Sequence, residues 1–142
     1  MTTTEVSVYS LLMRRTTPPN ARPTEFELEL LRLLWTKGEA TVRDLHEAVN
    51  ESRELGYTTI LKTMQIMTEK GLVEREESGK AHLYRATRSE QDTQRQFIGD
   101  IRERLFGGSV GQLVLQALSS ESVNANELEQ IKTLISKKER EQ

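Results

Sequence analysis

The sequence predicts a mainly α-helical protein with one small β-hairpin, and three observations lead to this fold class. Apolar residues recur at helical spacing from Thr24 to Lys70. Between Leu72 and Arg85 the spacing changes to that of two short strands joined by a Gly-containing turn. Beyond Ser89 the apolar spacing is helical again.

The composition limits both the size of the core and the kind of chemistry. The chain has 142 residues, of which 35% are hydrophobic, 30% are charged and none is cysteine. A large private core is therefore not expected, and a core shared between two copies is favoured. The absence of cysteine excludes disulfides, thiolate catalysis and cysteine metal sites. No apolar run approaches the length of a membrane span and the first residues are polar, so we expect a cytoplasmic protein without membrane insertion.

The first predicted helix begins at a capping box, because Thr24 is followed three residues later by Glu27. Gly38 ends it, and its apolar face is formed by Phe26, Leu30, Leu33 and Leu34. Residues 1–22 precede it, show weak periodicity and contain a Pro-Pro pair. We expect them to form a flexible N-terminal arm.

Two further helices and a hairpin follow in residues 41–85. Thr41 is the next N-cap, with Val42, Leu45 and Val49 on the buried face of the second helix. The third helix runs from about Thr58 to Lys70, and its buried face is Ile60, Leu61, Met64 and Met67. Strands at 72–76 and 81–85 flank a turn at 77–80. Three short helices and a hairpin are the layout of a winged helix-turn-helix domain, which we place at residues 23–88.

The C-terminal region, residues 89–142, contains three short amphipathic helices that cannot easily close a core of their own. We therefore expect a helical dimerisation region that packs against a second copy of the chain. The alternative is that these helices fold back on the winged helix of the same chain. The residues expected at the dimer interface are Phe97, Ile101, Leu105, Leu113, Val114, Leu118, Leu128, Ile131 and Ile135.

No constellation of residues predicts catalysis, a metal site or a cofactor. The two histidines, His46 and His82, lie on different predicted elements, and neither stands in a metal-binding spacing such as H-E-x-x-H. We expect His46 to be a solvated helix residue. Phosphate-binding and nucleophile-elbow motifs are also missing, so the sequence does not predict an enzyme.

The outward face of the third helix carries the residues that best fit DNA. Hydroxyl, amide and amino groups pair with base edges in the major groove, although an ordinary solvated face is the alternative. The expected base contacts are Thr58, Thr59, Lys62, Thr63 and Gln65. Tyr57 and the free N–H groups of the same turn suit a backbone phosphate.

Basic residues outside the third helix provide the expected contacts to the flanking DNA backbone. These residues are Arg43, Lys80, His82 and Arg85. The net charge of −2 counts against DNA binding, so any basic surface must arise from local arrangement. The outgoing strand is acidic through Glu74, Glu76 and Glu77.

Several segments in order resemble the BlaI/MecI/CopY penicillinase-repressor family. The Tyr-Thr-Thr-Ile segment at 57–60 and the Lys-Gly-Leu-Val segment at 70–73 are the more specific ones. The others are residues 24–29, 34–35, 41–45 and 80–84, and the resemblance covers roughly residues 22–120. It implies a sequence-specific transcriptional repressor that binds double-stranded operator DNA as a homodimer, on a short palindrome.

The resemblance also implies a trigger in one branch of the family, where a membrane sensor metalloprotease leads to cleavage of the repressor. This chain departs from the family pattern at several places. Ile66 stands where the family usually carries an Arg, and Gln116-Ala117 stands at the place of the cleaved Asn-Phe bond. The cysteines of the copper-responsive branch are absent. Copper sensing by that route is excluded.

Two other functions stay open at this point. The acidic balance suits a winged helix used as a protein-interaction module. A regulator that senses a small molecule is the other alternative, with a pocket lined by Trp35, Met64, Met67 and Phe97.

Overall fold

The structure, a computed structural model, describes residues 22–142. The predicted N-terminal arm, residues 1–22, lies outside this part of the chain apart from Arg22. The described chain forms two compact units that divide between Phe97 and Ile98, within helix α5 (Glu90–Leu105). Each unit is described by itself below.

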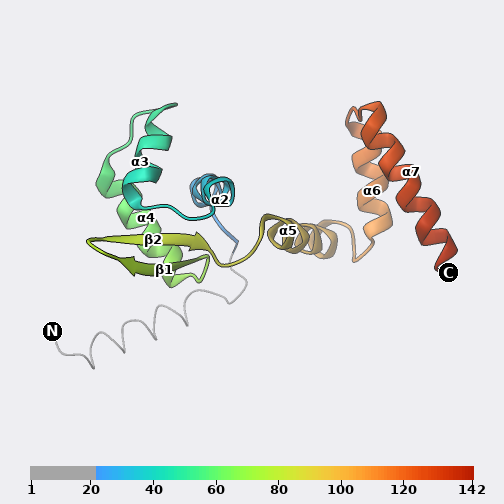
Figure 1. The fold of residues 1–142 in the computed structure, drawn as a ribbon. Helices are drawn as coiled ribbons and strands as arrows, with labels where there is room; N and C mark the ends of the chain where they lie inside the picture. The colour runs from blue at the N-terminus through green and yellow to red at the C-terminus, as the bar shows by residue number, and fades with distance from the viewer. Residues whose placement is uncertain (1–21) are drawn as a thin grey trace, which may run out of the picture. The chain divides into compact units, whose positions relative to one another are not determined.

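Three helices form the first part of the N-terminal unit: α2 (Glu25–Lys37), α3 (Val42–Asn50) and α4 (Tyr57–Glu69) (Figure 1). The predicted capping box at Thr24 and the predicted N-cap at Thr41 are confirmed, and the structure shows that the Thr41 cap is a capping box as well. The Thr24 hydroxyl oxygen accepts a bond from the Glu27 N–H at 3.2 Å, and the Thr41 oxygen accepts from the Asp44 N–H at 3.1 Å. Each box is reciprocal, so local sequence fixes where α2 and α3 begin.

The hairpin consists of antiparallel strands β1 (Val73–Ser78) and β2 (Ala81–Ala86), which we call the wing. The strands are longer than predicted and leave only Gly79 and Lys80 in the loop. Gly79 has a φ of 63°, as the first loop residue of a type II′ hairpin turn requires. The short turn keeps the pairing regular from Val73↔Ala86 to Ser78↔Ala81.

An isolated antiparallel β-bridge between Ala40 and Tyr84, which periodicity did not predict, attaches the wing to the helices. The Ala40 N–H donates to the Tyr84 carbonyl at 3.0 Å, and the Tyr84 N–H donates to the Ala40 carbonyl at 2.8 Å. Because Ala40 lies just before the N-cap of α3, this bridge holds β2 beside the first turn of α3. The mainly helical winged-helix fold with one hairpin is confirmed.

The core of the N-terminal unit is built from the apolar faces that periodicity predicted. Its fully buried members include Leu30, Leu34, Leu45, Val49, Ile60, Met64, Met67 and Tyr84. At one edge the buried Glu27 carboxylate accepts bonds at 2.8 Å from both Lys70 Nζ and the Thr24 N–H. This pairing satisfies a charge that would otherwise be costly to bury, and it joins the start of α2 to the end of α4.

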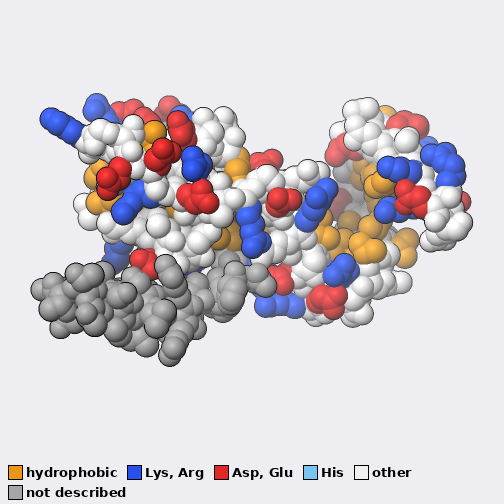
Figure 2. Space-filling view, turned by 60° about the horizontal axis from the view of Figure 1, so that its bottom comes forward, with side chains coloured by type: hydrophobic (Ala, Val, Ile, Leu, Met, Phe, Trp, Pro, Cys, Tyr) orange, Lys and Arg blue, Asp and Glu red, His pale blue; other side chains and the backbone are white. Residues whose placement is uncertain are grey.

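The C-terminal unit contains the end of α5, followed by α6 (Val110–Ser120) and α7 (Ala125–Arg140). Neither α6 nor α7 buries a single residue. Hydrophobic side chains are visible on the surface of this unit in Figure 2. Among the described helices, none is both long enough and apolar enough to cross a membrane.

Candidate nucleic-acid interface

The outward face of α4 carries four of its five predicted base-contacting residues as exposed side chains: Thr58, Thr59, Lys62 and Gln65. Thr63 is half-buried, and its hydroxyl donates a bond of 2.8 Å to the Thr59 carbonyl. That bond uses the hydroxyl proton of Thr63, so the hydroxyl oxygen can still accept a hydrogen bond from a ligand. The opposite face of α4 is buried through Ile60, Met64 and Met67, so the helix presents one polar face to solvent.

The start of α4 differs from that of its neighbours in having no side-chain cap. Gly56 is the N-cap and supplies no oxygen to the first N–H groups, and the first turn contains no acidic residue. In contrast, a side-chain oxygen caps each of α2, α3, α6 and α7. The positive end of the α4 dipole is therefore open to an anion such as a phosphate.

The turn between α3 and α4 is fixed by two side chains from the end of α3. Asn50 donates to the Leu55 carbonyl at 3.0 Å and accepts from the Leu55 N–H at 3.1 Å. His46 Nε2 lies 2.9 Å from the same carbonyl, and its ring meets the Tyr57 ring edge-on at 5.8 Å. The expectation of a solvated His46 is therefore wrong, because this half-buried ring holds the start of α4.

A groove between α3, α4 and the wing brings together residues that lie far apart in the sequence. We call it the wing groove, and it is lined by Thr41, Val42, Arg43, Tyr57, Leu61, Lys80, Ala81, His82 and Tyr84. Four of the predicted phosphate contacts, from three different elements, thus share one surface. The Ala40–Tyr84 bridge explains the meeting, since it fixes the wing next to Arg43.

The charge of Arg43 is available to a ligand in this groove. Arg43 Nε lies 3.3 Å from Glu47 Oε1, and the two side chains are 81% and 64% exposed. Exposed pairs one helical turn apart contribute only a few tenths of a kcal/mol in water, roughly, so a phosphate can compete with this one. At the same helix end, hydrogen bonds from the backbone N–H and hydroxyl of Thr41 lower the pKa of Asp44.

Arg85 is placed apart from the other predicted phosphate contacts. Its Nε bonds Glu74 Oε2 at 3.1 Å, and its Nη1 lies 3.4 Å from Glu76 Oε2. The hydrogen bond that Arg85 donates to Glu74, together with the charges of both carboxylates, raises the pKa of Arg85. Because side chains alternate along a strand, Arg85 and these two glutamates lie on the face of the wing opposite to Tyr84 and the groove.

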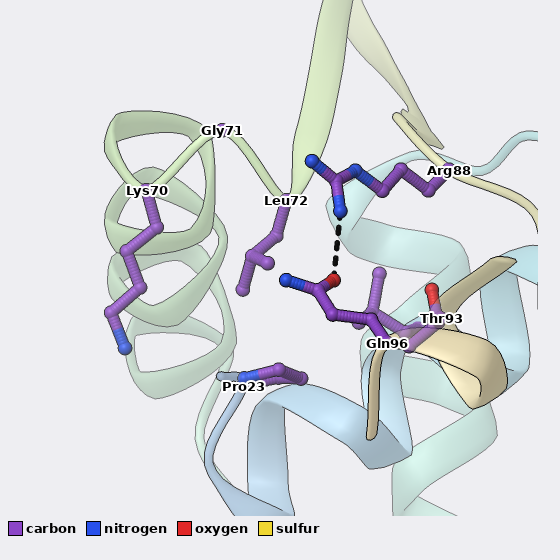
Figure 3. Close-up of a pocket in the computed structure, with 8 residues that line it drawn as sticks. Pro23, Lys70, Gly71, Leu72, Arg88, Thr93 and Gln96 are labelled. Carbon is purple, nitrogen blue, oxygen red and sulfur yellow. Dashed lines mark hydrogen bonds between the residues drawn. The ribbon is translucent and has the colours of Figure 1, made fainter. Parts of the chain in front are cut away.

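A second pocket lies within the N-terminal unit, and Figure 3 shows most of its lining residues. It is lined by Pro23, Leu31, Lys70, Gly71, Leu72, Arg88, Thr93 and Gln96. Both of its cations are already engaged, because Lys70 pairs with Glu27 and Arg88 Nη1 donates to Gln96 Oε1 at 2.8 Å (Figure 3).

The four residues expected to form a small-molecule pocket do not line this one. Met64 and Met67 are fully buried in the core, and Trp35 Nε1 donates to the Arg88 carbonyl at 2.9 Å. Phe97 is half-buried elsewhere on α5. The described residues also contain no group of three or more side chains suited to a metal ion.

Several known proteins are similar to this chain in sequence. The sequence model of the family described as "Penicillinase repressor" matches residues 23–137. The methicillin resistance regulatory protein MecI of Mammaliicoccus sciuri is 22% identical over 112 residues, which cover 79% of this chain and 91% of that protein. The transcriptional regulator BlaI of Mycobacterium tuberculosis is 36% identical over 61 residues, covering 42% and 44% respectively.

Two solved structures also match part of this chain. The first is the crystal structure of a possible transcriptional regulator for arsenical resistance, with 24% identity, coverage of 59% of this chain and 86% of that chain, and a TM-score of 0.44. The second is a homodimeric winged helix-turn-helix DNA-binding domain from Mycobacterium bovis, with 18% identity, coverage of 79% and 92%, and a TM-score of 0.41.

Proposed function

From the premise that this chain belongs to the penicillinase repressor family, we propose that it works as a homodimer on a palindromic operator. Membership makes it a DNA-binding transcriptional repressor and not an enzyme. The proposal adds how the DNA is held: α4 lies in the major groove and the wing groove holds the backbone beside it. Repression then follows from occupying the promoter.

The observation that carries this proposal is the convergence of cationic and polar groups around the uncapped start of α4. Arg43, Lys80 and His82 line the same groove as Tyr57, the first residue of α4. A backbone phosphate in this groove meets two full positive charges, while the outward face of α4 contacts base edges. Glu74 and Glu76, which contribute to the acidic net charge, lie on the far face of the wing and are paired with Arg85.

The homodimer is supported by the exposed apolar surface of the C-terminal unit. Leu105 is 76% exposed, Leu115 59% and Leu134 55%, and no residue of α6 or α7 is buried. An apolar surface of this kind is typical of an interface between copies. Of the predicted interface residues, Phe97, Leu113 and Ile131 are half-buried and the others are exposed.

We also propose that cleavage linked to a membrane protease releases the repressor from DNA, and only the resemblance to the family supports this step. The candidate bond, Gln116–Ala117, lies inside α6, and both residues are exposed. A protease that takes an extended substrate must first unwind this helix. Since α6 buries nothing in the single chain, the strength of the dimer sets how readily that unwinding occurs.

The base-contacting role of α4 is tested by titrating the protein against a DNA fragment selected from random sequence. Lys62→Ala and Thr59→Ala should each weaken binding about tenfold, while the dimer persists. Lys137→Ala removes the same charge from an exposed position on the side of α7 opposite to Leu128 and is the matched control. Wild-type affinity in both α4 variants contradicts the assignment of this face.

Salt dependence separates the repressor from a winged helix that binds only proteins. Affinity for the selected fragment should fall steeply with salt, because phosphate contacts release counterions. Lys80→Ala should reduce the slope of log affinity against log salt by about one per protomer. Failure of the wild type to retain any DNA fragment favours the protein-interaction module instead.

A further inference from the structure

Two large apolar side chains of the N-terminal unit are exposed within residues 22–97, and both belong to α4. Tyr57 is 47% exposed and Ile66 is 41% exposed. Tyr57 has a hydroxyl group and lines the wing groove, which accounts for its exposure. Ile66 has no polar atom in its side chain and packs into no part of the core, so folding alone does not explain it.

Ile66 lies on the face of α4 that carries the predicted base contacts. Residues four and seven positions apart share one side of a helix, so Ile66 stands in line with Lys62 and Thr59. The buried residues Met64 and Met67 point to the other side. Any DNA surface that meets Thr59 and Lys62 therefore also meets Ile66.

Within the major groove only one kind of base presents an apolar group. Thymine carries a C5-methyl group there, whereas the other bases show hydrogen-bonding atoms that an isoleucine cannot satisfy. We propose that Ile66 contacts the methyl group of a thymine and thereby specifies that base pair in each half-site. This inference rests on the proposed function, since it requires α4 to lie in the major groove.

The length of the helix locates the thymine relative to the other contacts. Ile66 lies eight positions after Thr58, which corresponds to a rise of about 12 Å along the helix at 1.5 Å per residue. With base pairs spaced by 3.4 Å, the thymine lies about three to four base pairs from the bases near Thr58 if α4 follows the groove. The next residue along this face is Glu69, whose carboxylate ends the apolar contact and disfavours a phosphate.

A protein partner for Ile66 is less consistent with its surroundings. The exposed neighbours of Ile66 on this face are Lys62, Gln65 and Glu69, so the apolar surface is a single side chain. Docking sites for proteins are larger and continuous. One methyl group, in contrast, matches the area that one isoleucine offers.

The test removes the methyl group without changing base pairing. Each thymine of a fragment selected by the wild-type protein is replaced in turn by deoxyuridine, and the affinities of wild type, Ile66→Val and Ile66→Ala are measured. For wild type, one thymine per half-site should lose about fourfold in affinity, as expected for burying one methyl-sized group. Ile66→Ala should bind the thymine fragment more weakly and respond little to deoxyuridine at that position, whereas Ile66→Val should keep the response.

Three outcomes overturn the inference. One is a wild type and an Ile66→Ala variant that share the same deoxyuridine profile. Another is a selected half-site without thymine three to four base pairs from the positions sensitive to Thr58→Ala. In both cases the protein binds DNA and the proposed function stands. A wild type that retains no fragment overturns the proposed function itself, and the inference with it.

Discussion

The two units of this chain place their apolar residues in opposite ways. In the N-terminal unit most leucines and methionines of α2, α3 and α4 are buried, including Leu45 and Met64, which are both 0% exposed. In the C-terminal unit comparable side chains stay in solvent, and Leu105 is 76% exposed. The first unit holds its own core, whereas the second leaves its apolar residues exposed, and we propose that a second copy of the chain covers them. On this proposal, stability and assembly depend on separate parts of the sequence.

The largest expected effect comes from opening the core of the N-terminal unit. Leu45→Ala should lower the free energy of unfolding of this unit by about 2–5 kcal/mol, because it removes buried methyl groups and leaves a cavity. Chemical denaturation followed by Trp35 fluorescence measures it. If the two units are independent, light scattering should still report a dimer. A monomeric Leu45→Ala protein at concentrations where wild type is dimeric contradicts that independence.

A charge on the apolar surface of α7 should have the converse effect. Leu128 is 39% exposed in the single chain, so Leu128→Glu spares the monomer fold and places two carboxylates in the proposed interface. We expect the dimer dissociation constant to rise at least about a hundredfold, with operator affinity falling as a consequence. Sedimentation equilibrium measures it, and Lys137→Glu, an exposed residue on the side of α7 opposite to Leu128, is the control. An unchanged dimer places the interface elsewhere.

A smaller effect is expected where the N-terminal unit orients its DNA-facing helix. Asn50→Ala removes bonds to both backbone groups of Leu55 and should cost about 1–2 kcal/mol of stability. It should also weaken operator binding, because the turn that positions the start of α4 loses its hydrogen bonds with Asn50. Asn50→Asp retains the acceptor and should recover part of the loss. Equal stability for wild type and Asn50→Ala refutes the bracing role.

The smallest effect concerns the cap of α3. The pKa of Asp44 is lowered in the folded chain by its bonds with Thr41. Its contribution to stability is therefore present above the ordinary pKa of an aspartate, about 3.9, and is lost as the pH falls through the lowered value. Asp44→Asn should flatten the acid side of the stability profile by less than about 1 kcal/mol. Glu54→Gln, on the exposed α3–α4 connection, is the matched control for the loss of one carboxylate.

The sequence predicted best what short-range interactions decide. The N-caps at Thr24 and Thr41 and the buried residues Ile60, Met64 and Met67 depend on residues within a few positions of one another, and they are confirmed. Leu61, expected on the same buried face, is half-buried instead and lines the wing groove. The Ala40–Tyr84 bridge joins residues 44 positions apart, and no local pattern encodes it. The wing groove depends on that bridge, so only the structure brings Arg43 to Lys80 and His82.

The contacts of individual polar side chains could not be predicted from the sequence either. No sequence pattern around His46 predicts its contact with the Leu55 carbonyl, because that contact depends on the path of the turn that follows α3. The pairing of Arg85 with Glu74 and Glu76 follows from the strand register. Had the register been predicted, the alternation of side chains would have placed Arg85 away from the groove.

We propose that the N-terminal unit contacts DNA while the C-terminal unit holds two copies together. Selection of fragments bound by the full chain from random double-stranded DNA tests this division most directly. We expect two inverted copies of one half-site, with centres about one helical turn apart, roughly 10 bp or somewhat more. A single, non-repeated site, or no enriched sequence at all, would contradict it.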